Sequence, residues 1–265
     1  MTLLLTTTAV SVGAAQAAAA AAPRMDPLHH FQVVKYIQIA PFGLDLSISN
    51  SVVWMWISLA AVFFFFRYAM RQPQLVPGRL QSVAEAGFLF IRGIVEENIG
   101  HGGRPYFPLI FTLFFFVLFC NWTGLIPGSF TATSQLIVTA TLALGIFFLS
   151  IFLGFYKHGL KFLGFFVPSG LPVLLLPLMV PIEIISFLAR PVSLSVRLFA
   201  NMTAGHTVLG VLFFFAATLP WVGSWLPFGF SVVFTAVEIF IGFIQAYIFT
   251  ILTCVYINDS LHLHH

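Results

Sequence analysis

Residues 171–219 read LPVLLLPLMVPIEIISFLARPVSLSVRLFANMTAGHTVLGVLFFFAATL, an apolar stretch with only three Lys, Arg, Asp or Glu residues. About 20 such residues already cross a bilayer as a helix. The stretch is therefore either two spans joined near residues 190–197 or one strongly tilted helix of roughly 70 Å. Pro181 and Pro191 would kink a single helix, which is tolerated where its backbone is buried against protein.

The composition of the whole chain agrees with a lipid environment. Hydrophobic residues make up 60% of the 265 residues and charged residues 7%, whereas soluble domains have about 25% charged residues. Lipid cannot satisfy backbone polar groups, so the spans are helices or a closed barrel, and unbroken apolar runs favour helices. The predicted fold class is an all-α membrane protein. Eleven dispersed Lys and Arg residues form no basic patch, so we expect no nucleic-acid partner.

Other apolar segments predict further spans. Between the apolar segments at about 50–66 and 105–120, apolar residues recur at helical spacing. On the opposite face lie Gln81, Glu85, Arg92 and Glu96, which predicts an amphipathic helix in the plane of the interface. The spans are expected at about residues 50–66, 105–120, 134–156 and 228–257, with turns at 121–133 and 220–227.

The basic residues predict the topology. Lys and Arg cluster in 67–104 and 157–161, whereas both turns are uncharged. By the positive-inside rule the basic segments face the cytoplasm or mitochondrial matrix. This alternation requires a single crossing between residues 161 and 220. We therefore expect five transmembrane helices plus the in-plane helix, with the N-terminus outside, the C-terminus inside, and the last two helices long and tilted.

The N-terminal part differs from the rest of the chain. Residues 1–22 run from a Leu-rich start into an Ala tract, a pattern that resembles a cleavable leader but lacks its positive n-region. The alternative is an Ala-rich tail that stays attached. We expect residues 1–45 to form a leader or periplasmic segment and residues 46–265 a single membrane domain.

Polar residues recur along one face of the 171–219 stretch. They are three or four residues apart and fall within an arc of about 80° on a helix. Such a ladder suits a proton or ion path, because charges inside a bilayer usually face protein or water. The alternative is that the charges only pair with one another, or that Arg190 extends to the interface. The ladder comprises Glu183, Ser186, Arg190, Ser193, Arg197 and Asn201.

The last apolar segment carries a second polar face with Glu238, Gly242, Gln245 and Tyr256. We expect the two faces to meet each other or a common partner. Beside Glu238, His206 is a candidate proton-relay group, because the carboxylate could set the protonation of the imidazole. The two residues then titrate as a coupled pair.

The motif RPVSLSVRLFANMTAGH (190–206), followed by Glu238 and by IQAYIF (244–249), resembles the signature of F-type ATP synthase a subunits. The resemblance extends from about Tyr106 to Asp259. Within it, CNWTGLIP (120–127) and LTCVYIND (252–259) resemble the alphaproteobacterial and mitochondrial branch. Many bacterial members have Glu where this chain has His206 and His where it has Glu238, so the pair is retained in exchanged order.

The resemblance implies a stator against which a ring of c subunits turns. Arg197 would face the ring and separate two aqueous half-channels. It has the physical properties for this, because guanidinium stays protonated and offers a planar set of donors to a carboxylate. The half-channel from the outside would be lined by Asn201, His206, Glu238 and Gln245, and the inner one by Glu183, Ser186 and Ser193.

The resemblance also implies a context. The chain would have no catalytic site of its own, no cofactor and no metal. It would work in the ATP synthase holoenzyme beside the c ring and b-type peripheral stalk subunits, in a bacterial inner membrane or, alternatively, a mitochondrial one. Whether protons or sodium ions move stays open; protons are expected. A haem-bearing redox subunit would need paired axial histidines and a self-contained transporter often has internal repeats, and the sequence has neither feature within its spans.

Overall fold

The computed structural model describes residues 35–37, 48–126, 128–166 and 175–261. The predicted leader, residues 1–22, lies outside the described residues. Two short antiparallel strands, β1 (Lys35–Ile37) and β2 (Ile48–Ser49), precede the helices. The rest is helical: α2 (Asn50–Ala69), α3 (Arg79–Asn98), η3 (Gly100–Tyr106), α4 (Phe107–Gly124), η4 (Ala132–Ser134), α5 (Leu136–His158), η5 (Gly159–Phe166), α6 (Leu176–Thr218) and α7 (Trp221–Leu261).

The all-α prediction is confirmed, and five helices in the described part of the chain are long and apolar enough to cross a membrane: α2, α4, α5, α6 and α7. The sixth, α3, is amphipathic as predicted. Ile91 and Ile94 are buried, while Arg92 and Glu96 are about half exposed. Gln81 is also on the polar face, since its side-chain amide donates to Glu85 one turn further along α3, but it is buried and also bonds the backbone of Gln74, before the helix.

Residues 176–218 form one helix, which resolves the ambiguity of the long apolar stretch. Pro181 and Pro191 both lie inside α6 without ending it. The backbone at Pro191 is supported by packing, since its side chain is buried. At 1.5 Å per residue α6 and α7 each extend roughly 60 Å, about twice the thickness of the hydrocarbon core. Both must therefore be inclined in a bilayer.

Two predicted turns are shorter than expected. Only Leu219 and Pro220 separate α6 from α7, so the predicted turn at 220–227 is wrong. Pro220 precedes the first helical residue, and Pro227 is accommodated within α7, where the carbonyl that loses its partner belongs to exposed Gly223. The 121–133 turn also starts late, because α4 continues through Gly124.

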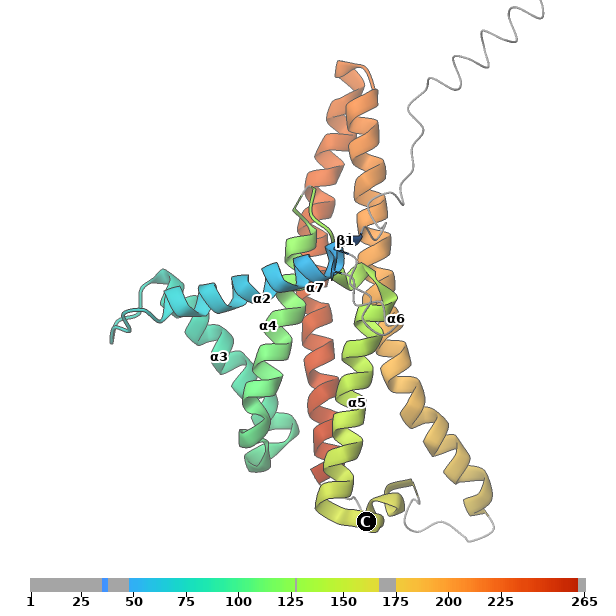
Figure 1. Ribbon diagram of the computed structural model, residues 1–265. Coiled ribbons are helices and arrows are strands. Elements are labelled where there is room, and N and C mark those ends of the chain that lie inside the picture. The colour runs from blue at the N-terminus through green and yellow to red at the C-terminus, as the bar shows by residue number, and fades with distance from the viewer. Residues whose placement is uncertain (1–34, 38–47, 127, 167–174, 262–265) are drawn as a thin grey trace, which may run out of the picture.

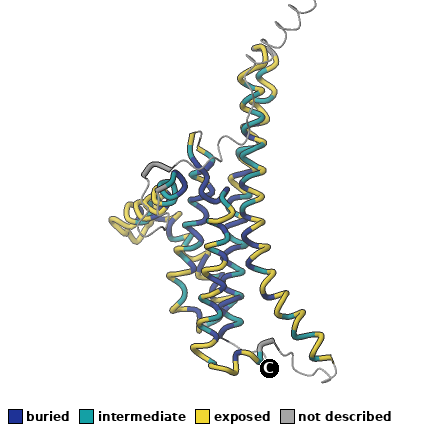
Figure 2. The backbone as a smooth tube through the Cα atoms, turned by 45° about the vertical axis from the view of Figure 1, so that its right-hand side comes forward, coloured by how far each residue is buried: buried dark blue, intermediate teal, exposed yellow. Residues whose placement is uncertain are grey.

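Figure 1 shows α4, α5 and α7 side by side, with α6 along them and its first turns leaning away. The four helices contact one another through α6–α7, α4–α7, α5–α6 and α5–α7. In the same view α2 runs across this direction, so the five candidate spans cannot all be parallel to one membrane normal. Buried residues concentrate where α4, α5, α6 and α7 meet (Figure 2). At the centre are the fully covered side chains of Ile110, Val117, Leu198, Ala246 and Phe249.

Candidate proton-path site between the two long helices

The contact between α6 and α7 contains an ionisable pair. His206 on α6 places Nδ1 2.8 Å from Oε1 of Glu238 on α7. The side chains are only 16% and 2% exposed, respectively. The Nδ1–H group also points to the Met202 carbonyl, one turn back on α6 and 2.9 Å away. The Glu238 carboxyl therefore makes an ion-pair contact rather than a straight hydrogen bond, and neither of its oxygens has a hydrogen-bond partner in the described part of the chain.

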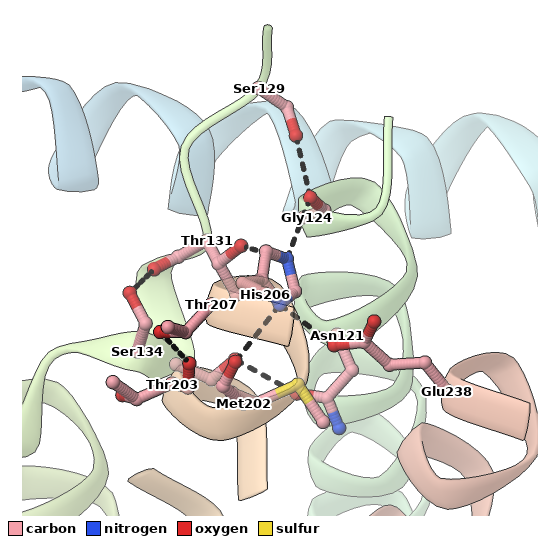
Figure 3. Close-up of polar contacts among 11 residues, drawn as sticks. Asn121, Gly124, Ser129, Thr131, Ser134, Met202, Thr203, His206, Thr207 and Glu238 are labelled. Atoms are coloured by element: carbon pink, nitrogen blue, oxygen red, sulfur yellow. Dashed lines mark hydrogen bonds and ion pairs between the residues drawn. The ribbon is translucent and has the colours of Figure 1, made fainter. Parts of the chain in front are cut away.

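The second ring nitrogen of His206 reaches the connection between α4 and α5. Its Nε2 lies 2.9 Å from the Gly124 carbonyl and 2.7 Å from Thr131 Oγ1 (Figure 3). Carbonyl oxygens only accept hydrogen bonds. Both ring nitrogens face such an acceptor, so both must carry hydrogen for every contact to be a hydrogen bond. The arrangement thus fits a doubly protonated imidazolium, whose charge would compensate a carboxylate buried at 2.8 Å.

Polar contacts continue along the α6–α7 interface toward Arg197. Asn201 Nδ2 donates to Gln245 Oε1 at 3.2 Å. From the other side of α7, Asn121 on α4 donates to the Gly242 carbonyl at 3.1 Å. Its amide oxygen accepts from Thr133 Oγ1 at 2.9 Å. The two Asn121 bonds connect α4, α7 and η4 inside the bundle, and the Asn201–Gln245 bond joins α6 to α7 at its exposed edge.

Arg197 is exposed on α6 and lines a groove of about 480 Å³ between α6 and α7. Ser186, Arg190 and Ser193 line the same groove, so the structure brings together four members of the predicted ladder. Within the described residues Arg197 has no ion pair or hydrogen bond. All five N–H donors of the Arg197 guanidinium are therefore available, and the group can bind an external carboxylate in bidentate geometry.

Two other ladder residues, Asn201 and Glu183, do not line this groove. Asn201 turns to Gln245, as described above, and Glu183 is half-buried near the start of α6 without lining the groove. Arg190 contacts a carboxylate, with Nη1 3.5 Å from Oδ2 of Asp259 near the end of α7. Arg190 therefore pairs with another charged residue, as the alternative interpretation expected, and it also lines the groove.

Several residues of the site were not predicted from the sequence. Thr131, Gly124 and Met202 surround His206, and Thr133 completes the contacts of Asn121. Asn121 and Thr133 belong to the uncharged polar segment between two apolar runs, which was the available signal. The carbonyls of Gly124 and Met202 have no sequence signal, because every residue has a carbonyl.

Together, five candidate spans and a buried ion pair between the two longest define a multi-pass α-helical membrane protein that holds ionisable groups within its spans. Such groups generally mark ion or proton paths. The model of the ATP synthase A chain family matches residues 52–258. The chain belongs to this family.

Individual relatives agree with the family match. The chain is 64% identical to ATP synthase subunit a of Magnetococcus marinus over 259 residues, which cover 96% of this chain and 100% of the relative. It is 48% identical to subunit a of Azorhizobium caulinodans over 245 residues, covering 90% and 98% of the two chains. Subunit a of Pelagibacter ubique is also 48% identical, over 241 residues that cover 91% and 99%. The relatives are mostly alphaproteobacterial, as the motifs predicted.

Proposed function

We propose that this chain is the stator subunit of the membrane sector of an F-type ATP synthase, with two proton half-channels that open against a rotating ring of c subunits. The observation that carries the proposal is the arrangement along α6. Arg197 is exposed in a groove, and nine residues further on, about 13 Å along the helix, the half-buried His206 contacts the buried Glu238. A ring carboxylate would meet the first site and protons would reach it through the second.

The half-channel from the outside contains His206, Glu238, Asn201 and Gln245. Protons enter beside Thr131 and reach the His206–Glu238 pair, which receives and releases them as a unit. Asn201 and Gln245 extend the polar path from the pair toward Arg197. Buried polar atoms without a hydrogen bond in the described chain, Thr203 Oγ1 and Gln245 Nε2, support a path in which these groups exchange partners.

The inner half-channel contains Ser186 and Ser193 in the Arg197 groove, with Glu183 nearer the start of α6. Arg190 and Asp259 lie at the same end of the bundle and set the charge there. Arg197 separates the two half-channels. Its guanidinium keeps a passing ring carboxylate ionised and repels a proton that would otherwise cross directly.

The remaining parts of the proposal concern context. The moving ion is a proton, because a His–Glu pair supplies proton-exchanging groups. The partners are the c ring and b-type peripheral stalk subunits of the holoenzyme. The location is a bacterial inner membrane, which the bacterial relatives support.

The test is the substitution Arg197→Ala in the complete complex. ATP-driven proton pumping in inverted membranes should be abolished, since no fixed cation then attracts the ring carboxylate. Arg197→Lys should also fail to restore normal pumping, because one ammonium cannot reproduce the planar fork. Arg79→Ala, on exposed α3 surface outside the groove, is the control and should pump normally. Coupled pumping near the normal rate in Arg197→Ala would remove this residue from the mechanism.

A further inference from the structure

Two cavities follow α3 on the side of the molecule away from the proposed proton path, and Phe88 lines both. The first has a volume of about 430 Å³ and lies among α2, α3 and α4. The second, of about 550 Å³, lies at the elbow where α3 passes through η3 into α4. Each volume falls within the range of roughly 300–1,000 Å³ that is usual for small-molecule sites.

The first cavity has a hydrocarbon-like wall. The rings of Phe66 of α2 and Phe111 of α4 pack at a tilt of 57° with 5.0 Å between centroids, and Leu89 of α3 completes the wall. Its single ionisable lining residue, Glu85, accepts a hydrogen bond from Gln81 Nε2 at 2.7 Å. Phe88 and Phe107, 4.9 Å apart, continue the aromatic surface into the second cavity. Within a bilayer an acyl chain leaves lipid and not water, so its contacts along these rings would be stabilised by van der Waals packing.

The second cavity adds two guanidinium groups. Arg92 uses Nε to bond Glu96 Oε1 at 2.8 Å, which leaves its terminal nitrogens for another acceptor. Arg104 in η3 is exposed, and its guanidinium has no ion pair or hydrogen bond to any residue in the described ranges. With Glu96 counted, these lining residues carry a net charge of +1, which favours an anion. Arginine recognises phosphate oxygens in two-pronged geometry.

We propose that the two cavities form a binding site for an anionic glycerophospholipid. Its phosphate binds Arg92 and Arg104, and one acyl chain passes Phe88 into the cavity bounded by α2, α3 and α4. An amphipathic helix such as α3 belongs at the membrane interface. The arginines lie in the basic segment predicted to face the cytoplasm, where anionic lipids and basic residues attract each other. A free phosphate would satisfy the polar cavity alone, whereas a phospholipid engages both.

Lipid retention by the purified complete synthase tests the proposal. The complex is equilibrated with phosphatidylcholine vesicles that contain phosphatidylglycerol, re-isolated, and its bound lipids are counted by native mass spectrometry. Wild type should retain phosphatidylglycerol in excess over the vesicle composition. The Arg92→Gln/Arg104→Gln double variant should lose this excess, with an affinity lower by roughly tenfold or more, because charge-assisted hydrogen bonds are lost.

A matched pair of substitutions tests the apolar cavity. Leu89 and Val83 are both 60% exposed on α3, but only Leu89 lines the cavity. Leu89→Trp should reduce phosphatidylglycerol retention and Val83→Trp should not. Equal retention in wild type and the arginine double variant would overturn the proposal. The proposal would also be overturned if Leu89→Trp retained phosphatidylglycerol as wild type does and inorganic phosphate displaced this lipid, since the site would then bind phosphate only. Loss of another subunit from the arginine double variant at unchanged lipid content would assign the elbow to a protein partner.

Discussion

Gly205 and Glu238 are in direct contact across the α6–α7 interface, and any side chain at position 205 would displace the Glu238 carboxyl from its place. A Cβ atom at position 205 would lie 2.7 Å from Cδ of Glu238, and closer still to one carboxyl oxygen. The absent side chain thus creates the space in which the carboxyl reaches His206. Gly205 directly precedes His206 in the sequence. The same turn of α6 therefore provides both the imidazole that contacts Glu238 and the space for the Glu238 carboxyl.

Gly205→Ala should therefore lower ATP-driven proton pumping. The added methyl pushes the Glu238 carboxyl away from His206 Nδ1 and weakens the contact through which the pair exchanges a proton. We expect pumping to slow by about tenfold, which corresponds to roughly 1.4 kcal/mol in the rate-limiting barrier. The measurement is pumping in inverted membranes. Gly210→Ala is the matched control, since a Cβ there meets nothing within 4 Å. Adding the shorter Glu238→Asp should partly rescue Gly205→Ala; equal pumping by the two alanine variants would show that the contact has no role.

Asn121 should contribute to stability rather than to proton movement. Its amide bonds the Gly242 carbonyl and Thr133 Oγ1 inside the bundle. Asn121→Ala removes both bonds and leaves the buried Thr133 hydroxyl without its acceptor, which costs about 1–3 kcal/mol. Thermal unfolding of the purified complex should show a lower Tm for Asn121→Ala and a smaller decrease for Thr133→Val. The double variant should lose less than the sum of the two, because they share one bond; strict additivity would argue against the Asn121–Thr133 bond.

The predicted topology can be tested with single cysteines at exposed positions. Ile126 follows α4 in the uncharged connection and is 56% exposed, and Leu160 in η5 lies in the basic segment and is 82% exposed. An impermeant thiol reagent should label Ile126→Cys from the outside only and Leu160→Cys from the inside only. Native Cys120 and Cys254 are buried and should not be labelled. Labelling of Ile126→Cys from the cytoplasmic side would overturn the five-crossing orientation.

The long helices could be predicted because their signal is cumulative. Apolar runs, the amphipathic pattern of α3 and the basic segments each involve many residues, so single exceptions such as Pro181 inside α6 do not hide them. The start of α7 was placed too late because Pro220 and Pro227 were both taken as turn residues. A proline tolerated inside a helix and one that ends a helix look alike in sequence.

The pairing of the polar faces could be predicted, but its details could not. Helical spacing places Asn201 on the polar face of α6 and both Glu238 and Gln245 on that of α7, whereas His206 was singled out as a titratable group and by the family resemblance. The structure brings Asn201 to Gln245 and His206 to Glu238. The surroundings of His206 depend on main-chain carbonyls and on Thr131 from a distant connection. Such contacts follow from how three elements pack, which no local pattern encodes.

In the proposed mechanism His206 and Glu238 load protons as one unit. Each single exchange, His206→Glu or Glu238→His, should sharply lower pumping, because it leaves two like groups facing each other in a buried site. The double exchange should recover part of the rate. Recovery should be incomplete, because a carboxylate at position 206 would face the Gly124 and Met202 carbonyls that now accept from the histidine.

ATP-driven pumping in inverted membranes, measured for wild type, both single exchanges and the double exchange at equal amounts of assembled complex, tests this claim most directly. If the two residues act as one unit, the double exchange should pump faster than either single variant. A double exchange no faster than the slower single variant would contradict it, because the two residues would then act independently.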